Sequence, residues 1–311
     1  MGKAKVILGA FFVGGCMGCI CQLFNMLYAF LIPDDALLFG SATLGLAQNY
    51  TAGFSLATCG FIMMILFLTG LLPKIEKVGG FGATLPLFGL VGAAAGSTLG
   101  CKAETGAPFV KAFFKGCWPF IRFLLIAFII TVPLSLLVGN FVKPDLSYVG
   151  AVPYIDPTIP ANGPALGAAA AAAFAPISLL WSFLFTGTLA VIGQIVVLLV
   201  KPKMKGILNI LMCGYILGCL ISMTGLFPFL AVYGTGGITA PVTGAGEFVF
   251  TSVMFGSVLG HIPGMWTTVI VRLVTFCLVI TIQFIWGIIA AAIVGSRAPA
   301  PRSDAPTEAT T

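Results

Sequence analysis

The chain has 311 residues, of which 59% are hydrophobic and only 8% are charged, and its mean hydropathy is +1.12. A soluble fold needs charged residues at about a quarter of its positions, so the composition excludes a soluble globular domain and predicts an all-α polytopic membrane protein. The formal net charge of +6 comes from basic residues spread along the ends of loops, which excludes a nucleic-acid-binding footprint.

Six long apolar runs are predicted to cross the membrane, since a span needs about 20 apolar residues. They are Val6–Ile32, Tyr50–Leu72, Cys117–Val142, Pro176–Val200, Ile207–Val232 and Met265–Val294. The first run follows a basic start that is typical of a secretory signal, Met1-Gly2-Lys3-Ala4-Lys5. The run then continues with little sign of a small-residue cleavage site, which predicts an uncleaved first span.

Two further segments, Gly79–Gly100 and Gly234–Gly260, are rich in glycine and interrupted by Pro86 and Pro241. Either could be a full span or a re-entrant hairpin, and the distribution of Lys and Arg decides between the two. With both segments re-entrant and the N-terminus cytoplasmic, only Lys143 lies outside and twelve basic residues lie on the cytoplasmic side. The twelve are Lys3, Lys5, Lys74, Lys77, Lys102, Lys111, Lys115, Lys201, Lys203, Lys205, Arg297 and Arg302. With two full spans the tally is seven against six, so we predict re-entrant segments and cytoplasmic N- and C-termini.

A proline-rich polar segment divides the chain into two halves. We predict a first membrane repeat over residues 1–142, an external linker over 143–166, a second membrane repeat over 167–295 and a disordered cytoplasmic tail over 296–311. Each repeat holds three spans and one re-entrant segment, and three crossings is an odd number. The second repeat is therefore predicted to be inverted relative to the first.

The two halves share sequence where this topology requires it. Residues 11–22 match residues 183–194 at a constant offset of 172, with Phe, Gly, Ile and Gln in common. Residues 69–89 match residues 224–244 at an offset of 155, and both contain Thr-Gly-Leu-x-Pro…Gly-x-x-Gly-x-Thr-x-Pro-x-x-Gly. The Arg…Thr pair of 122–131 recurs in 272–281 at an offset of 150. Inverted repeats place binding or conduction sites at their interface near the midplane, commonly with broken helices.

This repeated block resembles the stage V sporulation A (SpoVA) membrane proteins of spore-forming bacteria, particularly their AC and AE components. The segment Gly236–Gly244, with Pro241-Val242-Thr243-Gly244, is the closer copy of the family signature, and Gly82–Gly89 is a looser one. Family members usually carry one such domain, so this chain is expected to be a tandem fusion. The resemblance implies a bacterial cell membrane, in particular the inner spore membrane, and movement of dipicolinic acid, with calcium, during sporulation and germination.

The glycine/proline segments are the first candidates for a substrate pathway. Non-helical backbone at membrane depth must be buried in protein or face a water-filled cavity, and its free N–H groups can bind an anion. The alternative is a tight packing turn without solute contact. The candidate residues are Gly79, Gly82, Thr84, Pro86, Gly89, Gly234, Gly237, Thr239, Pro241 and Gly244.

Charged and polar residues within the spans complete the predicted pathway. Arg122 and Arg272 cost free energy within a membrane unless they are paired or face water. A guanidinium can bind a carboxylate bidentately. Arg122 alternatively snorkels to the interface. Glu247 could pair with Arg272, gate the path or coordinate calcium. Gln22 and Gln194 occupy matching positions, where they either hydrogen-bond between helices or line the pathway.

We therefore expect a channel or transporter subunit for a small organic anion, with the lipid bilayer and other SpoVA-type subunits or a second copy of the chain as partners. A non-conducting scaffold for sporulation proteins and a tension-gated pore of low selectivity are the alternatives. Neither an enzyme nor a metal or cofactor site is expected, because the sequence offers no paired carboxylates, metal-ligand cluster or nucleophile–base set. Cysteines such as Cys16, Cys19 and Cys21 are interpreted as packing residues.

Overall fold

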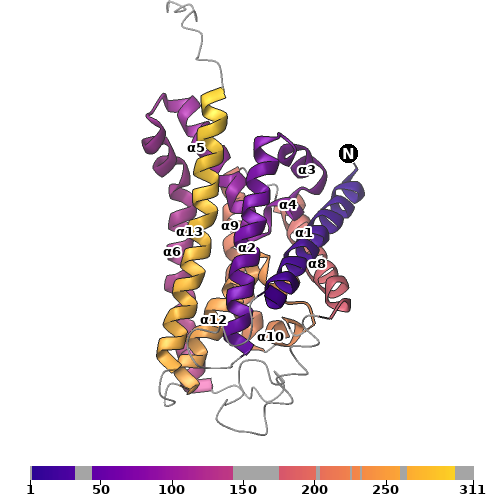
Figure 1. Ribbon diagram of the computed structural model, residues 1–311, viewed down its shortest axis with the longest axis vertical. Helices are drawn as coiled ribbons and strands as arrows, with labels where there is room; N and C mark the ends of the chain where they lie inside the picture. The colour runs from indigo at the N-terminus through magenta and orange to yellow at the C-terminus, as the bar shows by residue number, and fades with distance from the viewer. Residues whose placement is uncertain are drawn as a thin grey trace, which may run out of the picture.

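The computed structural model describes residues 2–31, 44–142, 175–200, 204–224, 226–231, 233–259 and 265–297 (Figure 1). Within these ranges every element is helical, apart from turns and one isolated β-bridge. The elements in chain order are α1 Lys3–Leu31, α2 Leu44–Leu68, α3 Leu72–Gly79, α4 Phe81–Thr84, the 3-10 turn η2 Leu87–Gly89, α5 Leu90–Thr105, α6 Phe109–Leu137, the π-helical turn η3 Val138–Val142, α8 Ile177–Val200, α9 Met204–Met223, α10 Leu226–Ala231, α11 Thr235–Thr239, α12 Val242–Leu259 and α13 Met265–Arg297. The predicted linker 143–166 lies outside the described residues, and α13 continues two residues into the predicted tail.

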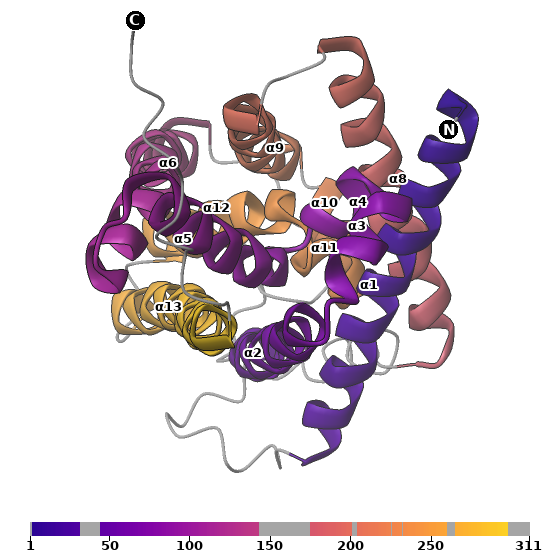
Figure 2. The ribbon, with the colours of Figure 1, turned by 90° about the horizontal axis from the view of Figure 1, so that it is seen from above.

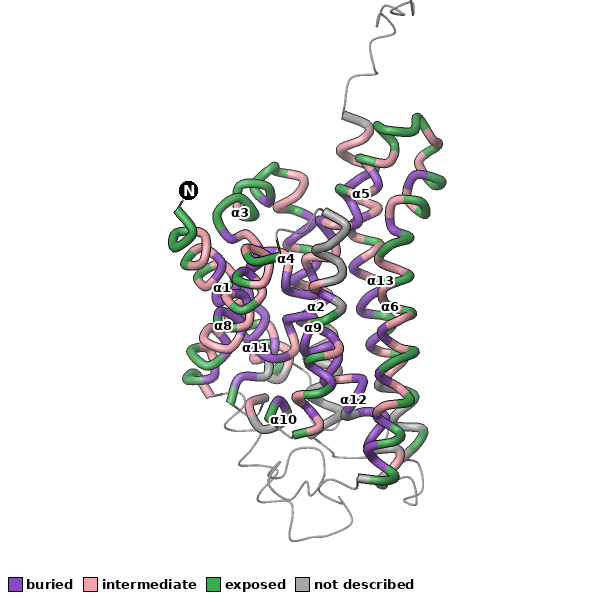
Figure 3. The backbone as a smooth tube through the Cα atoms, turned by 180° about the vertical axis from the view of Figure 1, so that it is seen from behind, coloured by how far each residue is buried: buried purple, intermediate pink, exposed green. Residues whose placement is uncertain are grey.

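Several helices are long and apolar enough to cross a membrane, as the composition predicted. Four of them qualify alone, over Lys3–Tyr28, Phe109–Phe141, Ile177–Val200 and Leu273–Gly295, and a fifth results if α2 and α3 are counted as one bent span. Large apolar side chains point outward from these helices, with Phe30 85% exposed and Ile129 70% exposed. Figure 3 shows the buried residues gathered along the middle of the bundle, with the exposed ones around it. The chain is therefore an all-α membrane-embedded protein.

The helix of the second predicted span ends before its apolar run does, and it begins earlier. α2 ends at Leu68, and α3 leaves it at an angle of 103°. Gly70 makes this bend, since its φ of +70° lies in the left-handed region that disfavours other residues. Pro73 then starts the first turn of α3, where its missing N–H has no helical partner to lose. The apolar run Ile207–Val232 is divided in the same way, because α9 ends at Met223 and α10 begins at Leu226.

The two glycine/proline segments enter the bundle from opposite ends. Figures 1 and 3 show α3 and the C-terminal end of α5 at one end, while α10 and the C-terminal end of α12 lie at the other. Between them, the short helices α4 and α11 lie near the middle of the bundle (Figure 3). Each segment thus begins and finishes at the same end of the bundle, as a re-entrant hairpin does.

Basic residues gather at the end of the bundle that holds α3. Lys74 and Lys77 lie on α3, Lys102 lies in the last turn of α5, and Lys111 and Lys115 lie near the start of α6. The N-terminal end of α1 and the C-terminal end of α13 lie at this end as well (Figure 1). We call it the basic end. Of the other residues in the charge count, Lys143, Lys201, Lys203 and Arg302 lie outside the described residues.

Candidate functional site: the central junction

The two broken segments meet in the middle of the protein at their prolines. Pro86 and Pro241 face each other in an isolated antiparallel bridge. The Leu87 N–H donates to the Ala240 carbonyl oxygen at 2.7 Å, and the Val242 N–H donates to the Leu85 carbonyl oxygen at 3.1 Å. The bonds run beside the prolines rather than through them, so neither ring removes a donor that the bridge needs.

Two glutamines hold these segments from the neighbouring helices. The Phe81 N–H, at the start of α4, donates to Gln194 Oε1 at 2.8 Å. The Gly236 N–H, in the first turn of α11, donates to Gln22 Oε1 at 2.7 Å. The first N–H groups of a helix have no partner within the helix, and both glutamines are buried. Each glutamine therefore satisfies a backbone donor that would otherwise be buried without a partner. We call residues 79–89 and 234–244, together with the parts of α1 and α8 that touch them, the central junction.

The contacts of the junction come in equivalent pairs. When each residue is replaced by the matching residue of the other half, one contact of a pair becomes the other. At the offset of 155 the two bonds of the bridge map onto each other, and so do the bonds from Gly89 N–H to Pro86 O (2.8 Å) and from Gly244 N–H to Pro241 O (2.9 Å). Phe81 maps onto Gly236 at the same offset, while Gln22 maps onto Gln194 at 172. The two glutamine bonds are therefore equivalent as well.

The contacts between α1 and α8 come in equivalent pairs of the same kind. A Cβ on Gly15 would lie 2.7 Å from the Phe183 ring, and a Cβ on Gly187 would lie 2.9 Å from the Phe11 ring. The rings of Phe11 and Phe183 themselves meet edge to face at 5.5 Å between centroids. Both glycines are needed for the helices to approach this closely. Figure 2 shows α1 and α8 side by side along one flank of the bundle.

One side of the junction is polar and the other is apolar. Four buried polar residues surround Gln22, and with it they form what we call the polar cluster: Asn25 on α1 and Ser178, Ser182 and Thr186 on α8. The positions equivalent to these four at an offset of 172 are Val197, Val6, Ala10 and Gly14. The symmetry of the backbone is therefore not matched by the side chains, which differ in chemistry between the two sides.

The polar cluster contains hydrogen-bonding groups that are not used. Gln22 Nε2 donates to Ser178 Oγ at 2.9 Å, and Thr186 Oγ1 donates to the Gly237 carbonyl oxygen at 3.0 Å. Both amide atoms of Asn25 and the hydroxyl of Ser182 are buried, and no described residue hydrogen-bonds to them. A buried polar group without a partner costs about 1–3 kcal/mol. This side of the junction thus holds unused donors and unused acceptors side by side.

Sequence reasoning missed the polar cluster apart from Gln22. The signal was present, because Ser178, Ser182 and Thr186 recur at intervals of four residues, which places them on one face of α8. Asn25 follows Gln22 by three residues on α1, so these two also share a face. A polar stripe at helical spacing inside an apolar span is the pattern that finds such a cluster.

The predicted pathway glycines lie at close contacts in the junction. Gly79 faces the Val13 side chain, Gly82 faces the backbone of Ala10, and Gly244 faces the Ile238 carbonyl oxygen. On the other side, Gly234 and Gly237 both face Ser182 of the polar cluster. A Cβ on Gly89 would lie 3.2 Å from the Thr84 carbonyl oxygen, and the Thr84 hydroxyl itself donates to the Phe81 carbonyl oxygen at 3.2 Å. Thr239 is half-buried. That these residues line a pathway stays a prediction.

The charged candidates lie on α6, α12 and α13. The Arg122 side chain is exposed on α6, as a snorkelling arginine is. Arg272 belongs to α13, and its side chain lies outside the described part of the structure. Glu247 is buried on α12, with 9% of its surface exposed. The pairing of Glu247 with Arg272 stays a prediction.

The chemistry that the junction offers is non-covalent. Amides, hydroxyls and unwound backbone can replace the water around a small polar solute. Comparison of the chain with protein-family models, with curated proteins and with solved structures found no match. The function is therefore inferred from the residues of the junction and from the internal repeat.

Proposed function

We propose that this protein is a channel or transporter subunit for a small organic anion, built from two inverted repeats whose interface is the central junction. The exchange of equivalent contacts supports the repeat, and so does the entry of the two hairpins from opposite ends. In such proteins the substrate site lies near the midplane, where broken helices meet. The observation that carries the proposal is the polar cluster, in which Asn25 and Ser182 are buried without a hydrogen-bond partner among the described residues. Ser182 lies beside Gly234 and Gly237 at the broken helix α11.

The substrate class that we propose is a pyridine dicarboxylate, dipicolinate, in keeping with the resemblance to SpoVA proteins. The Asn25 amide and the Ser182 hydroxyl can each donate to a carboxylate oxygen. Arg272, one of the two arginines predicted to lie within a span, would supply the bidentate partner that a carboxylate favours. Glu247 would carry the negative charge for calcium if the cation accompanies the anion. The proposed setting is the inner spore membrane, with the basic end on the cytoplasmic side.

The junction would act as the gate. Two backbone bonds of the bridge and two glutamine bonds hold the halves of the junction together. At about 0.5–1.5 kcal/mol net for each hydrogen bond, the four contribute roughly 2–6 kcal/mol. A difference of a few kcal/mol between two states leaves a minor open state that a ligand can favour. Opening at Pro86 and Pro241 would connect the polar cluster to the basic end.

Flux through liposomes tests this proposal. Purified protein in vesicles loaded with dipicolinate is expected to release it down its gradient, and Asn25→Leu is expected to lower the rate about tenfold or more. Val197→Leu is the matched control, because Val197 is the equivalent position on the apolar side, and its rate should equal that of the unaltered protein. Arg272→Gln is expected to reduce release of dipicolinate more than release of an uncharged pyridine of similar size.

Three outcomes would overturn the proposal. Absence of flux under both a solute gradient and membrane tension would indicate a non-conducting scaffold. Tension-triggered release of unrelated solutes at the same rate as dipicolinate would indicate a pore of low selectivity. Equal loss of flux in Asn25→Leu and Val197→Leu, with both variants folded, would show that the solute does not pass through the polar cluster.

A further inference from the structure

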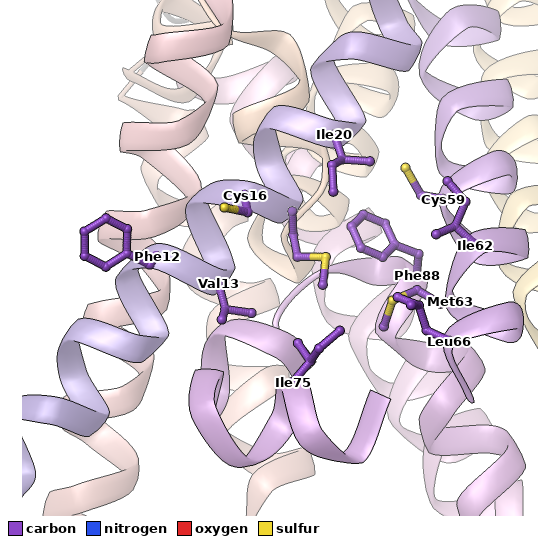
Figure 4. A pocket seen from close by; sticks show the side chains of 11 residues that line it. Phe12, Val13, Cys16, Ile20, Cys59, Ile62, Met63, Leu66, Ile75 and Phe88 are labelled. Carbon is purple, nitrogen blue, oxygen red and sulfur yellow. The ribbon is translucent and has the colours of Figure 1, made fainter. Parts of the chain in front are cut away.

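An apolar cavity lies between α1, α2 and α3, apart from the central junction's polar cluster. Its volume is about 300 Å³, and all of its lining side chains are apolar. Figure 4 shows Val13 of α1, Ile62 of α2 and Ile75 of α3 around it, with Phe88 of η2 closing the inner side. Apolar surface is stabilised when it is removed from water, so the occupant that this cavity favours is an apolar group.

The cavity lies where lipid can reach it. Phe12 and Cys16 belong to its lining, and both are exposed on α1, Phe12 to 58%. On α2 the neighbouring Phe61 and Ile65 are 41% and 42% exposed. In a bilayer, the material that meets exposed apolar surface of this kind is the hydrocarbon of the acyl chains. An acyl chain is therefore the occupant that matches the cavity in chemistry and in position.

Helix α3 carries Lys74, Glu76 and Lys77, a net charge of +1, at one side of this cavity. Ile75 reaches the cavity from α3, while Lys74 and Lys77 on the same short helix are exposed. α3 bends away from α2 by 103° at the basic end, so in a bilayer its lysines would face the lipid headgroups. Lys3 and Lys5 are exposed in the first turns of α1, whose residues Gly9 and Val13 contact the C-terminal part of α3.

The equivalent region of the second half lacks these charges. At the offset of 155, Lys74 corresponds to Phe229 and Lys77 to Val232, and α10 has the uncharged sequence Leu-Phe-Pro-Phe-Leu-Ala. Charge at this helix is therefore not a requirement of the fold. We propose that the cavity binds one anionic phospholipid, with an acyl chain between α1 and α2 and the phosphate at Lys74 and Lys77. This inference does not depend on the proposed transport function.

Native mass spectrometry of the purified full chain tests the site. The protein is delipidated in mild detergent and titrated with phosphatidylglycerol or with phosphatidylcholine of the same acyl chains. Unaltered protein should retain one phosphatidylglycerol at concentrations where phosphatidylcholine does not bind. Each lysine near a headgroup is worth about fivefold in affinity, so K74Q/K77Q should reduce the preference for phosphatidylglycerol about twentyfold or more. Ile62→Trp fills the cavity and should abolish retention of both lipids.

Matched controls separate this site from general attraction to lipid. K111Q/K115Q removes two lysines from the same end of the bundle, on α6, and should leave the preference unchanged. Ile129→Trp adds the same bulk on the exposed face of α6 and should leave retention unchanged. The proposal is overturned if Ile62→Trp retains lipid as the unaltered protein does, or if the two lysine pairs reduce the preference equally. Dipicolinate flux is a separate measurement. A negative result for lipid binding would therefore not refute the proposed transport, and absence of flux would not refute the lipid site.

Discussion

Gln194 and Gln22 offer a direct test of what holds the central junction together. Replacing Gln194 with Leu keeps a similar shape but removes the acceptor of the Phe81 N–H, which is then buried without a partner. Interhelical side-chain hydrogen bonds in membranes contribute only about 0.6 kcal/mol on average. Here the loss should be larger, about 1–3 kcal/mol, because a backbone donor is stranded in a dry site. That range corresponds to a reduction of about 5- to 140-fold in the folding equilibrium constant.

Gln22→Leu should cost more than Gln194→Leu. It strands the Gly236 N–H and also removes the donor to Ser178 Oγ. Equilibrium unfolding in mixed micelles with increasing dodecyl sulfate measures both losses. Thr281→Val is the control, because the Thr281 hydroxyl is exposed and bonds only within its own helix, to the Cys277 carbonyl oxygen. Losses for both glutamine variants below that of the control would refute the role assigned to the glutamines.

Three further predictions follow from the same structure. Gly218→Ala should lower the unfolding free energy by about 1–3 kcal/mol through overpacking, because the added Cβ would clash with the Thr243 carbonyl oxygen. Gly100→Ala is the control: its Cβ would meet open space, so the unfolding free energy in the dodecyl sulfate titration should hardly change. Cysteines introduced at the exposed Ala103 and Leu226 should be labelled by an impermeant thiol reagent from the cytoplasmic side and from the outside, respectively. Labelling of the first from the outside, or of the second from the cytoplasm, would contradict the re-entrant arrangement. Asn25→Leu should raise the thermal midpoint, since it removes two unpaired buried groups, and a lower midpoint would mean that Asn25 has a partner in the folded state.

Much of the architecture was predictable because it depends on properties that the sequence displays locally. The solvent preference of the chain predicted a helical membrane protein, and Pro86 and Pro241 predicted the two breaks, since proline cannot continue a helix. The constant offsets predicted which residues would be equivalent. Of the two alternatives for Gln22 and Gln194, the structure shows hydrogen bonds between elements, and lining of a pathway stays a prediction.

Other features depended on tertiary contacts that no local pattern reveals. The partner of each glutamine is a backbone N–H in the opposite half of the chain, more than a hundred residues away. The early end of α2 follows from the turn at Gly70, which apolar content alone hides. The polar cluster was missed because the sequence does not show that Asn25 and Ser182 are buried together where α1, α8 and α11 meet.

The one-sidedness of the polar cluster bears on why both halves share a single polypeptide. Two separate identical subunits facing each other across a twofold axis must present the same residue on both flanks, so Asn25 on one flank would require Asn25 on the other. Covalent linkage removes that constraint, and Val197 can occupy the matching place. The residues of the two flanks can then differ, so that one flank is polar and the other is apolar and closely packed. A molecule with unlike flanks can distinguish the direction from which a solute arrives.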